Sequence, residues 1–190
     1  MGGWCGWTGA VMGVTAVATA AAASAAAAGP QAASADGQWT LAADDEAQGL
    51  VLRDAAGAVQ RRYPARSLDG RERGRARQVL ALAARRSFLV SFEGLPEWWE
   101  IALDPRAEPV YDGLVHDYRM GEGLASAGFL GVRRTRLSEP LLIVSLDGAG
   151  FALGRGAPRA DGRFELQVVQ LDLRKAVARF AVAPDLQPGW

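Results

Sequence analysis

Cysteine, histidine and lysine are almost absent from this chain of 190 residues. Each occurs once, as Cys5, His116 and Lys175. A single cysteine excludes an intramolecular disulfide framework, and its place near the N-terminus leaves the rest of the chain without a thiolate. A single histidine excludes the common metal sites that use two or more imidazoles. His116 is therefore the only side chain that could act as a neutral nitrogen ligand.

An excess of charge of either sign is also absent. Lys and Arg together number 21, Asp and Glu together number 21, and the formal net charge is zero. No overall field attracts nucleic acid or an anionic membrane, so we expect no nucleic-acid partner. The basic stretch from Ser67 to Arg77 is interrupted by acidic residues and has no aromatics, which indicates a solvated surface connection, with room for one helical turn.

The first 35 residues contain no charged side chain at all. An apolar run from Trp7 to Ala28 is followed by the A-x-A pattern of Ala33-Ser34-Ala35, which predicts a secretory signal peptide over residues 1–35. The run of about 20 residues is also long enough to span a bilayer, so an uncleaved leader is the one expected route to a membrane. We therefore expect a single β-rich domain over residues 36–190, located in the periplasm or secreted.

The remaining chain consists of short apolar runs separated by turn residues. Runs of strand length bounded by Asp, Gly and Pro are typical of antiparallel meanders. The predicted strands are Trp39–Ala43, Gly49–Arg53, Ala58–Tyr63, Gln78–Ala84, Ser87–Phe92, Trp98–Leu103, Leu141–Leu146, Phe151–Gly154, Phe164–Leu173 and Ala176–Val182.

These strands form about three units of roughly 40 residues each, which is the period of β-propeller blades. The prediction is therefore an all-β fold whose antiparallel meanders form propeller-like blades. Known propellers close with about four to eight blades, so a chain of this length forms a partial or small propeller with open sheet edges. A β-sandwich needs only the same meanders packed face to face and is the alternative.

The stretch from Leu95 to Arg136 gathers most of the residues with distinctive chemistry. It contains His116, adjacent tryptophans, a group of carboxylates and the pair Arg133-Arg134. No G-x-S-x-G motif accompanies the histidine, so serine hydrolase chemistry is not indicated and a role other than catalysis is favoured. A structural explanation is open for the same residues: His116 and Asp117 could pair to hold a loop, the tryptophans could fill the core, and the arginines could form a solvated face.

The chain from about Arg85 to Phe180 resembles the cytochrome d1 haem domain-like proteins, a β-propeller family. The matching segments are Arg86-Ser87-Phe88-Leu89-Val90, Leu95-Pro96-Glu97-Trp98-Trp99-Glu100-Ile101, Tyr111-Asp112-Gly113-Leu114-Val115-His116-Asp117-Tyr118-Arg119-Met120-Gly121-Glu122-Gly123 and Arg133-Arg134. The resemblance implies a propeller fold and a link to redox chemistry. No C-x-x-C-H motif is present, so a covalently attached c-type haem is not expected.

Haem or another tetrapyrrole is the cofactor that this resemblance brings into consideration. His116 would be the axial metal ligand, because one imidazole suffices in haem proteins. Arginines suit the macrocycle's carboxylates and aromatic rings suit its plane. The candidate cofactor-binding residues are therefore His116, Tyr118, Arg119, Arg133, Arg134 and Trp99.

Two functions follow from the sequence. The first is an exported, non-catalytic binding or assembly module associated with a redox system, which meets a protein partner or a second copy of itself through its open sheet edges and needs no cofactor. The second is a tetrapyrrole-binding protein with His116 as axial ligand.

Overall fold

The computed structural model describes residues 29–111, 125–148 and 150–183. Strands and turns make up this part of the chain, and it contains no helix that could cross a membrane. The strands are β1 Gln31–Ala33, β2 Trp39–Asp44, β3 Gly49–Asp54, β4 Val59–Pro64, β5 Arg75–Leu82, β6 Ser87–Glu93, β7 Glu97–Ala102, β8 Val110–Tyr111, β9 Ala125–Ser126, β10 Val132–Arg136, β11 Leu142–Leu146, β12 Phe151–Arg155, β13 Phe164–Gln170 and β14 Lys175–Val182.

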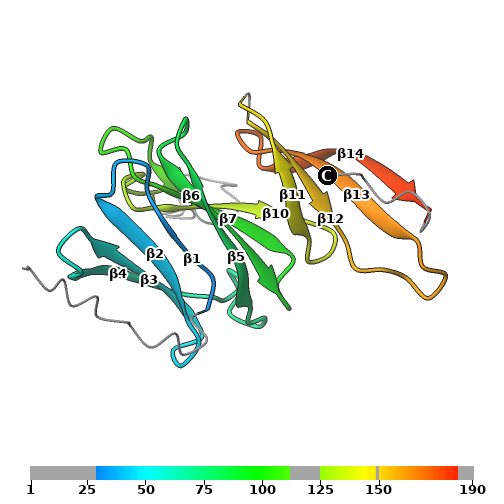
Figure 1. The fold of residues 1–190 in the computed structure, drawn as a ribbon, viewed down its shortest axis with the longest axis horizontal. Coiled ribbons are helices and arrows are strands. Elements are labelled where there is room, and N and C mark those ends of the chain that lie inside the picture. The colour runs from blue at the N-terminus through cyan, green and yellow to red at the C-terminus, as the bar shows by residue number, and fades with distance from the viewer. Residues whose placement is uncertain (1–28, 112–124, 149, 184–190) are drawn as a thin grey trace, which may run out of the picture.

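Twelve of these strands form three antiparallel sheets of four strands each. We call them blade 1 (β1-β2-β3-β4), blade 2 (β5-β6-β7-β10) and blade 3 (β11-β12-β13-β14). They stand side by side along the molecule, with blade 2 in the middle (Figure 1). The first strand of blade 2, β5, contacts the first strands of both neighbours, β1 and β11. This arrangement confirms the predicted all-β class with antiparallel meanders as propeller-like blades.

Blade 2 is buried on both faces, which explains its uninterrupted apolar runs. Side chains alternate between the two faces of a strand. Along β6, Phe88 and Val90 face blade 1, whereas Leu89 faces blade 3. The adjacent tryptophans of β7 separate in the same way, with Trp99 toward blade 1 and Trp98 toward blade 3. A sheet covered on both sides needs apolar residues at successive positions, as seen in its sequence.

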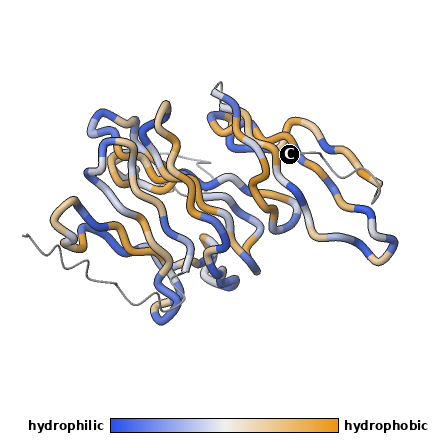
Figure 2. Tube along the Cα trace, in the orientation of Figure 1, coloured by the Kyte–Doolittle hydropathy of each residue, from blue (hydrophilic) through white to orange (hydrophobic). Residues whose placement is uncertain are grey.

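Two hydrophobic clusters hold the blades together. The cluster between blades 1 and 2 is the larger and includes Leu41, Leu50 and Leu52 of blade 1. The cluster between blades 2 and 3 includes Ile143 and Val169 of blade 3. Apolar segments accordingly run through the central sheet and through blade 3 (Figure 2). Burial of these side chains at about 25 cal/mol per Å² is the main force that stacks the sheets.

The connection between β7 and β10 is the longest in the chain. The short ribbon of β8 and β9 pairs Val110 with Ser126 and Tyr111 with Ala125. A Cβ at Gly128 would collide with the main-chain carbonyl of Glu108, so the return path needs glycine there. Its start lies at the same end of blade 2 as the β5–β6 turn, since Leu103 N donates to the Arg86 carbonyl, and its return contacts blade 1, where Arg61 and Tyr63 donate to the Leu130 carbonyl.

Besides the two-residue strands β8 and β9, which were not predicted, three segments differ from the sequence prediction. Residues Gln31–Ala33, inside the predicted leader, form β1 and pair with β2. Residues Val132–Arg136, for which no strand was predicted and whose arginines could have formed a solvated face, form β10 and pair with β7 over five residues. The connection predicted for Ser67 to Arg77 ends earlier, because β5 begins at Arg75, and it contains a bridge between Arg66 and Arg73 rather than a helical turn.

Candidate functional site

The six residues predicted to contact a cofactor fall into two groups. His116, the predicted metal ligand, lies outside the described residues, as do Tyr118 and Arg119. Trp99, Arg133 and Arg134 are described. β10 pairs Arg134 with Trp99 and Arg133 with Glu100, so the two arginines point to opposite faces of blade 2.

Arg134 and Trp99 belong to a buried polar cluster between blades 1 and 2. The guanidinium carbon of Arg134 lies 4.2 Å from the ring centroid of Trp99, a cation–π contact. Arg134 Nη1 donates hydrogen bonds to Glu97 Oε2 at 3.0 Å and to the main-chain carbonyl of Arg66 at 2.7 Å. Trp99 Nε1 donates to the same Glu97 oxygen at 2.7 Å. Phe92 completes the cluster, with its ring edge-on to Trp99 at 4.7 Å between centroids.

This cluster supports the packing of the blades. Trp99 is only 1% exposed, so contact between its ring and a cofactor would require blades 1 and 2 to separate. Glu97 is equally buried, and a buried carboxylate needs both a cation and hydrogen-bond donors. Arg134 supplies the cation and the Trp99 indole supplies a donor. The structure therefore brings these two predicted residues together, but inside the fold.

Arg133 lies on the other face, at a groove between blades 2 and 3. The groove has a volume of about 240 Å³. Its lining comes from the β7–β10 connection, β10 and the β13–β14 turn: Glu108, Pro109, Val110, Tyr111, Arg133, Leu171, Asp172 and Arg174. Within the described chain, neither Arg133 nor Arg174 forms a salt bridge, and Tyr111 is well exposed. Two unpaired guanidinium groups beside an aromatic ring are suited to an anionic, planar group.

A network centred on Arg85 closes one side of this groove. Arg85 Nε and Nη2 donate to the two oxygens of Glu100 at 2.7 and 3.0 Å, and Nη2 also donates to Asp172 Oδ1 at 2.7 Å. Ser87 Oγ donates to Glu100 Oε1 at 2.8 Å. The hydrogen bond from Arg85 holds the pKa of Asp172 below its usual range, and the nearby charge of Arg133 adds to the effect. The network therefore joins blade 2 to the β13–β14 turn of blade 3.

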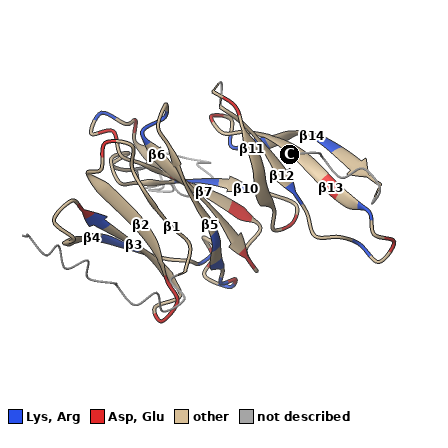
Figure 3. Ribbon diagram, viewed as in Figure 1, with Lys and Arg blue, Asp and Glu red and all other residues tan. Residues whose placement is uncertain are grey.

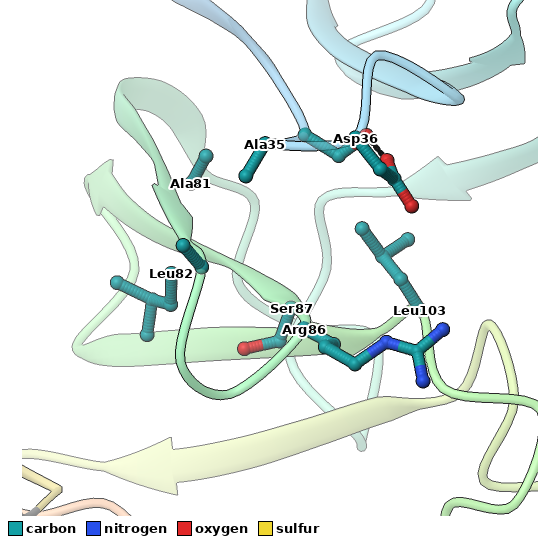
Figure 4. Close-up of a pocket in the computed structure, with 9 residues that line it drawn as sticks. Ala35, Asp36, Ala81, Leu82, Arg86, Ser87 and Leu103 are labelled. Carbon is teal, nitrogen blue, oxygen red and sulfur yellow. Dashed lines mark hydrogen bonds between the residues drawn. The ribbon is translucent and has the colours of Figure 1, made fainter.

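A second cavity lies between blades 1 and 2, near β1 and β5. Figure 4 shows Asp36, from the β1–β2 turn, on the side of the cavity where Leu103 and Arg86 lie, with Ala81 and Leu82 of β5 on the other side. Ser34 Oγ donates to Asp36 Oδ1 at 2.6 Å, and this hydrogen bond lowers the pKa of Asp36. The cavity holds about 150 Å³, and ligand pockets usually hold about 300–1,000 Å³. It accommodates a few water molecules rather than a cofactor.

The groove at Arg133 is also below that range, so the residues that line it do not enclose a whole tetrapyrrole. They could hold one carboxylate-bearing edge of such a molecule. No group of three or more His, Cys, Asp or Glu side chains within the described ranges is arranged to hold a metal ion.

The sequence analysis identified Arg133 but missed Arg85, Glu100, Asp172 and Arg174. Arg85 and Asp172 are 87 positions apart, so nothing local links them. One sequence feature pointed weakly to this contact. Arg85 and Asp172 each follow the end of a strand, at a turn, and in adjacent blades such turns lie at the same end of the sheets.

Comparison with known proteins shows that the fold of this chain is similar to a solved structure. No family model matches the chain, and no curated protein matches it. Among solved structures, the chain is similar to one named dihydro-haem d1 dehydrogenase NirN in complex with DHE, with a TM-score of 0.59 and 21% sequence identity. The match covers 80% of this chain and 28% of that one, so the chain spans under a third of the length of this structural relative. The similarity is one of fold: the three blades share the arrangement of part of that structure.

Proposed function

We propose that this protein is a non-catalytic, cytochrome d1-like β-propeller-type module that works by binding another protein surface. The observation that supports the proposal is the uncovered apolar face of blade 3. We call this face, which lies opposite blade 2, the outer face of blade 3. Its residues are Phe151, Leu153, Leu166, Val168, Ala178 and Phe180.

The strand register identifies these residues. Leu153 pairs with Val168, and Val168 pairs with Ala178, so the three side chains share one face. Their neighbours Ala152 and Val169 point the other way and are buried against blade 2. In a propeller the corresponding face of a blade is covered by the next blade. Within the described residues nothing covers it, which favours association with another protein.

Export and association with a redox system are part of the same proposal. The apolar leader predicted over residues 1–35 supports export to the periplasm or secretion. The fold relation to a protein named as a haem d1 dehydrogenase supports an association with redox chemistry. No catalytic residue is needed for such a role.

Tetrapyrrole binding is the second candidate, and the groove at Arg133 favours it. Arg133 and Arg174 would hold a carboxylate of the macrocycle, and Tyr111 would lie against its plane. His116 would be the axial ligand. Bound haem would supply the redox chemistry, while the two arginines would orient it.

An absorption titration separates the two candidates. Haem is added to the purified protein and the Soret region is followed, in parallel with His116→Ala, Arg133→Ala and the control Arg53→Ala on blade 1. We expect no saturable Soret band from the unmodified protein. A band that saturates near one equivalent, and that is lost in His116→Ala and weakened in Arg133→Ala but not in Arg53→Ala, would overturn the cofactor-free module and establish the second candidate.

A further inference from the structure

We propose that the outer face of blade 3 binds the same face of a second copy of this chain, so that the protein forms a two-fold symmetric dimer. This inference rests on the proposed function and names its partner. It follows from the different chemistry of the two end faces of the molecule.

The outer face of blade 3 has an apolar centre and a polar rim. Phe180 is 53% exposed and Phe151 is 38% exposed, although both belong to the regular part of a sheet. The charged side chains on the same face by register, Arg155 and Lys175, lie at the ends of their strands. Arg155 packs over the ring of Phe164, with 5.7 Å between the guanidinium carbon and the ring centroid. An apolar centre with a charged rim is the usual composition of a protein interface.

The outer face of blade 1 contains more polar side chains, beside Ala42, Val51 and Val59. Thr40 and Arg53 point away from blade 2 because their strand neighbours Leu41 and Leu52 are buried against it, and Arg62 does so because its neighbour Tyr63 is buried there. Arg62 Nη1 forms a salt bridge with Asp44 at 2.7 Å. Figure 3 shows basic residues along β4; blade 3 also contains charged residues, but Glu165 and Arg179 belong by register to the face that points toward blade 2.

The difference between the outer faces of blades 1 and 3 favours a two-fold contact over a head-to-tail contact. A head-to-tail contact would place blade 3 of one copy on blade 1 of the next, and would bury arginine side chains against an apolar surface without new partners, which is costly. It would also continue as an open chain of subunits unless it closed into a ring. A two-fold contact pairs the apolar face with itself, buries no unpaired charge at its centre and closes after two copies.

The size of the face determines the expected affinity. Four strands about 4.8 Å apart and about 20 Å long give a footprint of about 400 Å². This footprint is about half of the standard of about 800 Å² per partner, so the contact is a small one even though side chains add to its accessible area. We therefore expect a dimer with a dissociation constant on the order of micromolar, which separates on dilution.

Sedimentation velocity over a dilution series of the purified protein tests the inference. We expect a monomer–dimer equilibrium. Phe180→Glu should shift the midpoint to at least about tenfold higher concentration, because two carboxylates would be placed in one apolar interface. The matched control is Val59→Glu on blade 1, which introduces the same charge at a strand residue that is 41% exposed. The control should leave the midpoint unchanged, and far-UV circular dichroism should show that both variants are folded.

Three outcomes would overturn the two-fold dimer. They are a monomer at every concentration, an equilibrium that Val59→Glu weakens as much as Phe180→Glu does, and growth beyond two copies. The second and third outcomes indicate a head-to-tail contact. A monomer that also binds no haem leaves the proposed binding module intact with a different protein as partner, whereas a saturable haem complex refutes the proposed function whatever the oligomeric state.

Discussion

At the scale of single residues, two adjacent arginines have separate roles because they lie on a strand. Arg134 is enclosed with Glu97 and Trp99, while Arg133 faces the groove. We expect Arg134→Ala to lower the free energy of unfolding by about 3–5 kcal/mol, since it leaves the buried Glu97 carboxylate without its cation. Urea unfolding measures the change. Arg133→Ala is the matched control, and its effect should stay within about 0.5 kcal/mol.

A double variant distinguishes loss of charge pairing from loss of packing. Arg134→Met with Glu97→Gln removes both charges, keeps an acceptor for the Trp99 indole and retains a long side chain over its ring. We expect it to be clearly more stable than Arg134→Ala. Equal stability of the two variants would show that the ion pair is not what Arg134 contributes.

The contact between Arg85 and Asp172 makes stability depend on pH. Arg85 lowers the pKa of Asp172 in the folded state, so the contact stabilises the fold above the ordinary aspartate pKa of about 3.9. This contribution is lost as the pH falls through the lower, folded-state pKa. Asp172→Asn should therefore be less stable than the unmodified protein at neutral pH, by up to about 1 kcal/mol because Asp172 is half-exposed, and the difference should vanish in acid.

Urea unfolding at several pH values tests this dependence. In an Arg85→Ala background the pH-dependent effect of Asp172→Asn should be much smaller, because the hydrogen bond that lowers the pKa most is gone and only the weaker effects of Gln170 and Arg133 remain. A constant difference between the two proteins from neutral pH to pH values well below the ordinary aspartate pKa would contradict the assignment.

At the scale of elements, β1 is the strand that removal of the predicted leader would affect. It pairs with β2 from Gln31 to Ala33, and Ala32 packs against the core between blades 1 and 2. Removal of a leader after Ala35 would take this strand away. We expect a chain that begins at Asp36 to be about 2–4 kcal/mol less stable than one that begins at Gly29, since several strand hydrogen bonds are lost.

Comparison of the two chains by urea unfolding measures that difference, and the intact mass of the protein isolated from its own cells identifies which N-terminus is used. A matched pair within β1 provides a control. Ala32→Asp places a charge toward the core and should be destabilising, whereas Ala33→Asp points away from the core and should have little effect. Equal stability of the two truncated chains would show that β1 does not support blade 1.

The strands that sequence reasoning predicted share one property: their own residues form apolar runs bounded by turns. This holds for β6 and β7, where burial on both faces leaves a continuous apolar pattern. β1 was missed because a short Ala-rich segment after an apolar run has the composition of a leader. β10 was missed because three arginines in five residues read as a solvated segment. Its strand conformation depends on β7 and on the burial of Arg134, which are tertiary effects.

The candidate site could also be predicted only in part, because part of it depends on tertiary contacts. Arg133 was selected together with Arg134, from the family resemblance and because guanidinium groups suit carboxylates, and nothing local in the sequence separates the two arginines. The network of Arg85, Glu100 and Asp172 brings together two blades, and register between blades is decided by packing. Local patterns contain no information about it.

At the scale of the whole molecule, the blades adhere through close contacts that glycine permits. Gly154 of β12 lies against Trp98 of blade 2, and a Cβ there would come within 2.8 Å of the indole carbon Cζ2 and of Leu141 Cδ1. These neighbours are fully buried, so they have little room to move. The contact therefore fixes the distance between blades 2 and 3.

We expect Gly154→Ala to lower the free energy of unfolding by about 1–3 kcal/mol, because one added methyl group forces the two sheets apart. Gly148→Ala is the matched control: no heavy atom lies within 4 Å of an added Cβ there, so its effect should be small. Urea unfolding of both variants makes the comparison. If the blades were only loosely joined, Gly154→Ala would lower the free energy of unfolding no more than Gly148→Ala does. Blade 3 would then be a separate unit, and its inner face would be as accessible to partners as its outer face.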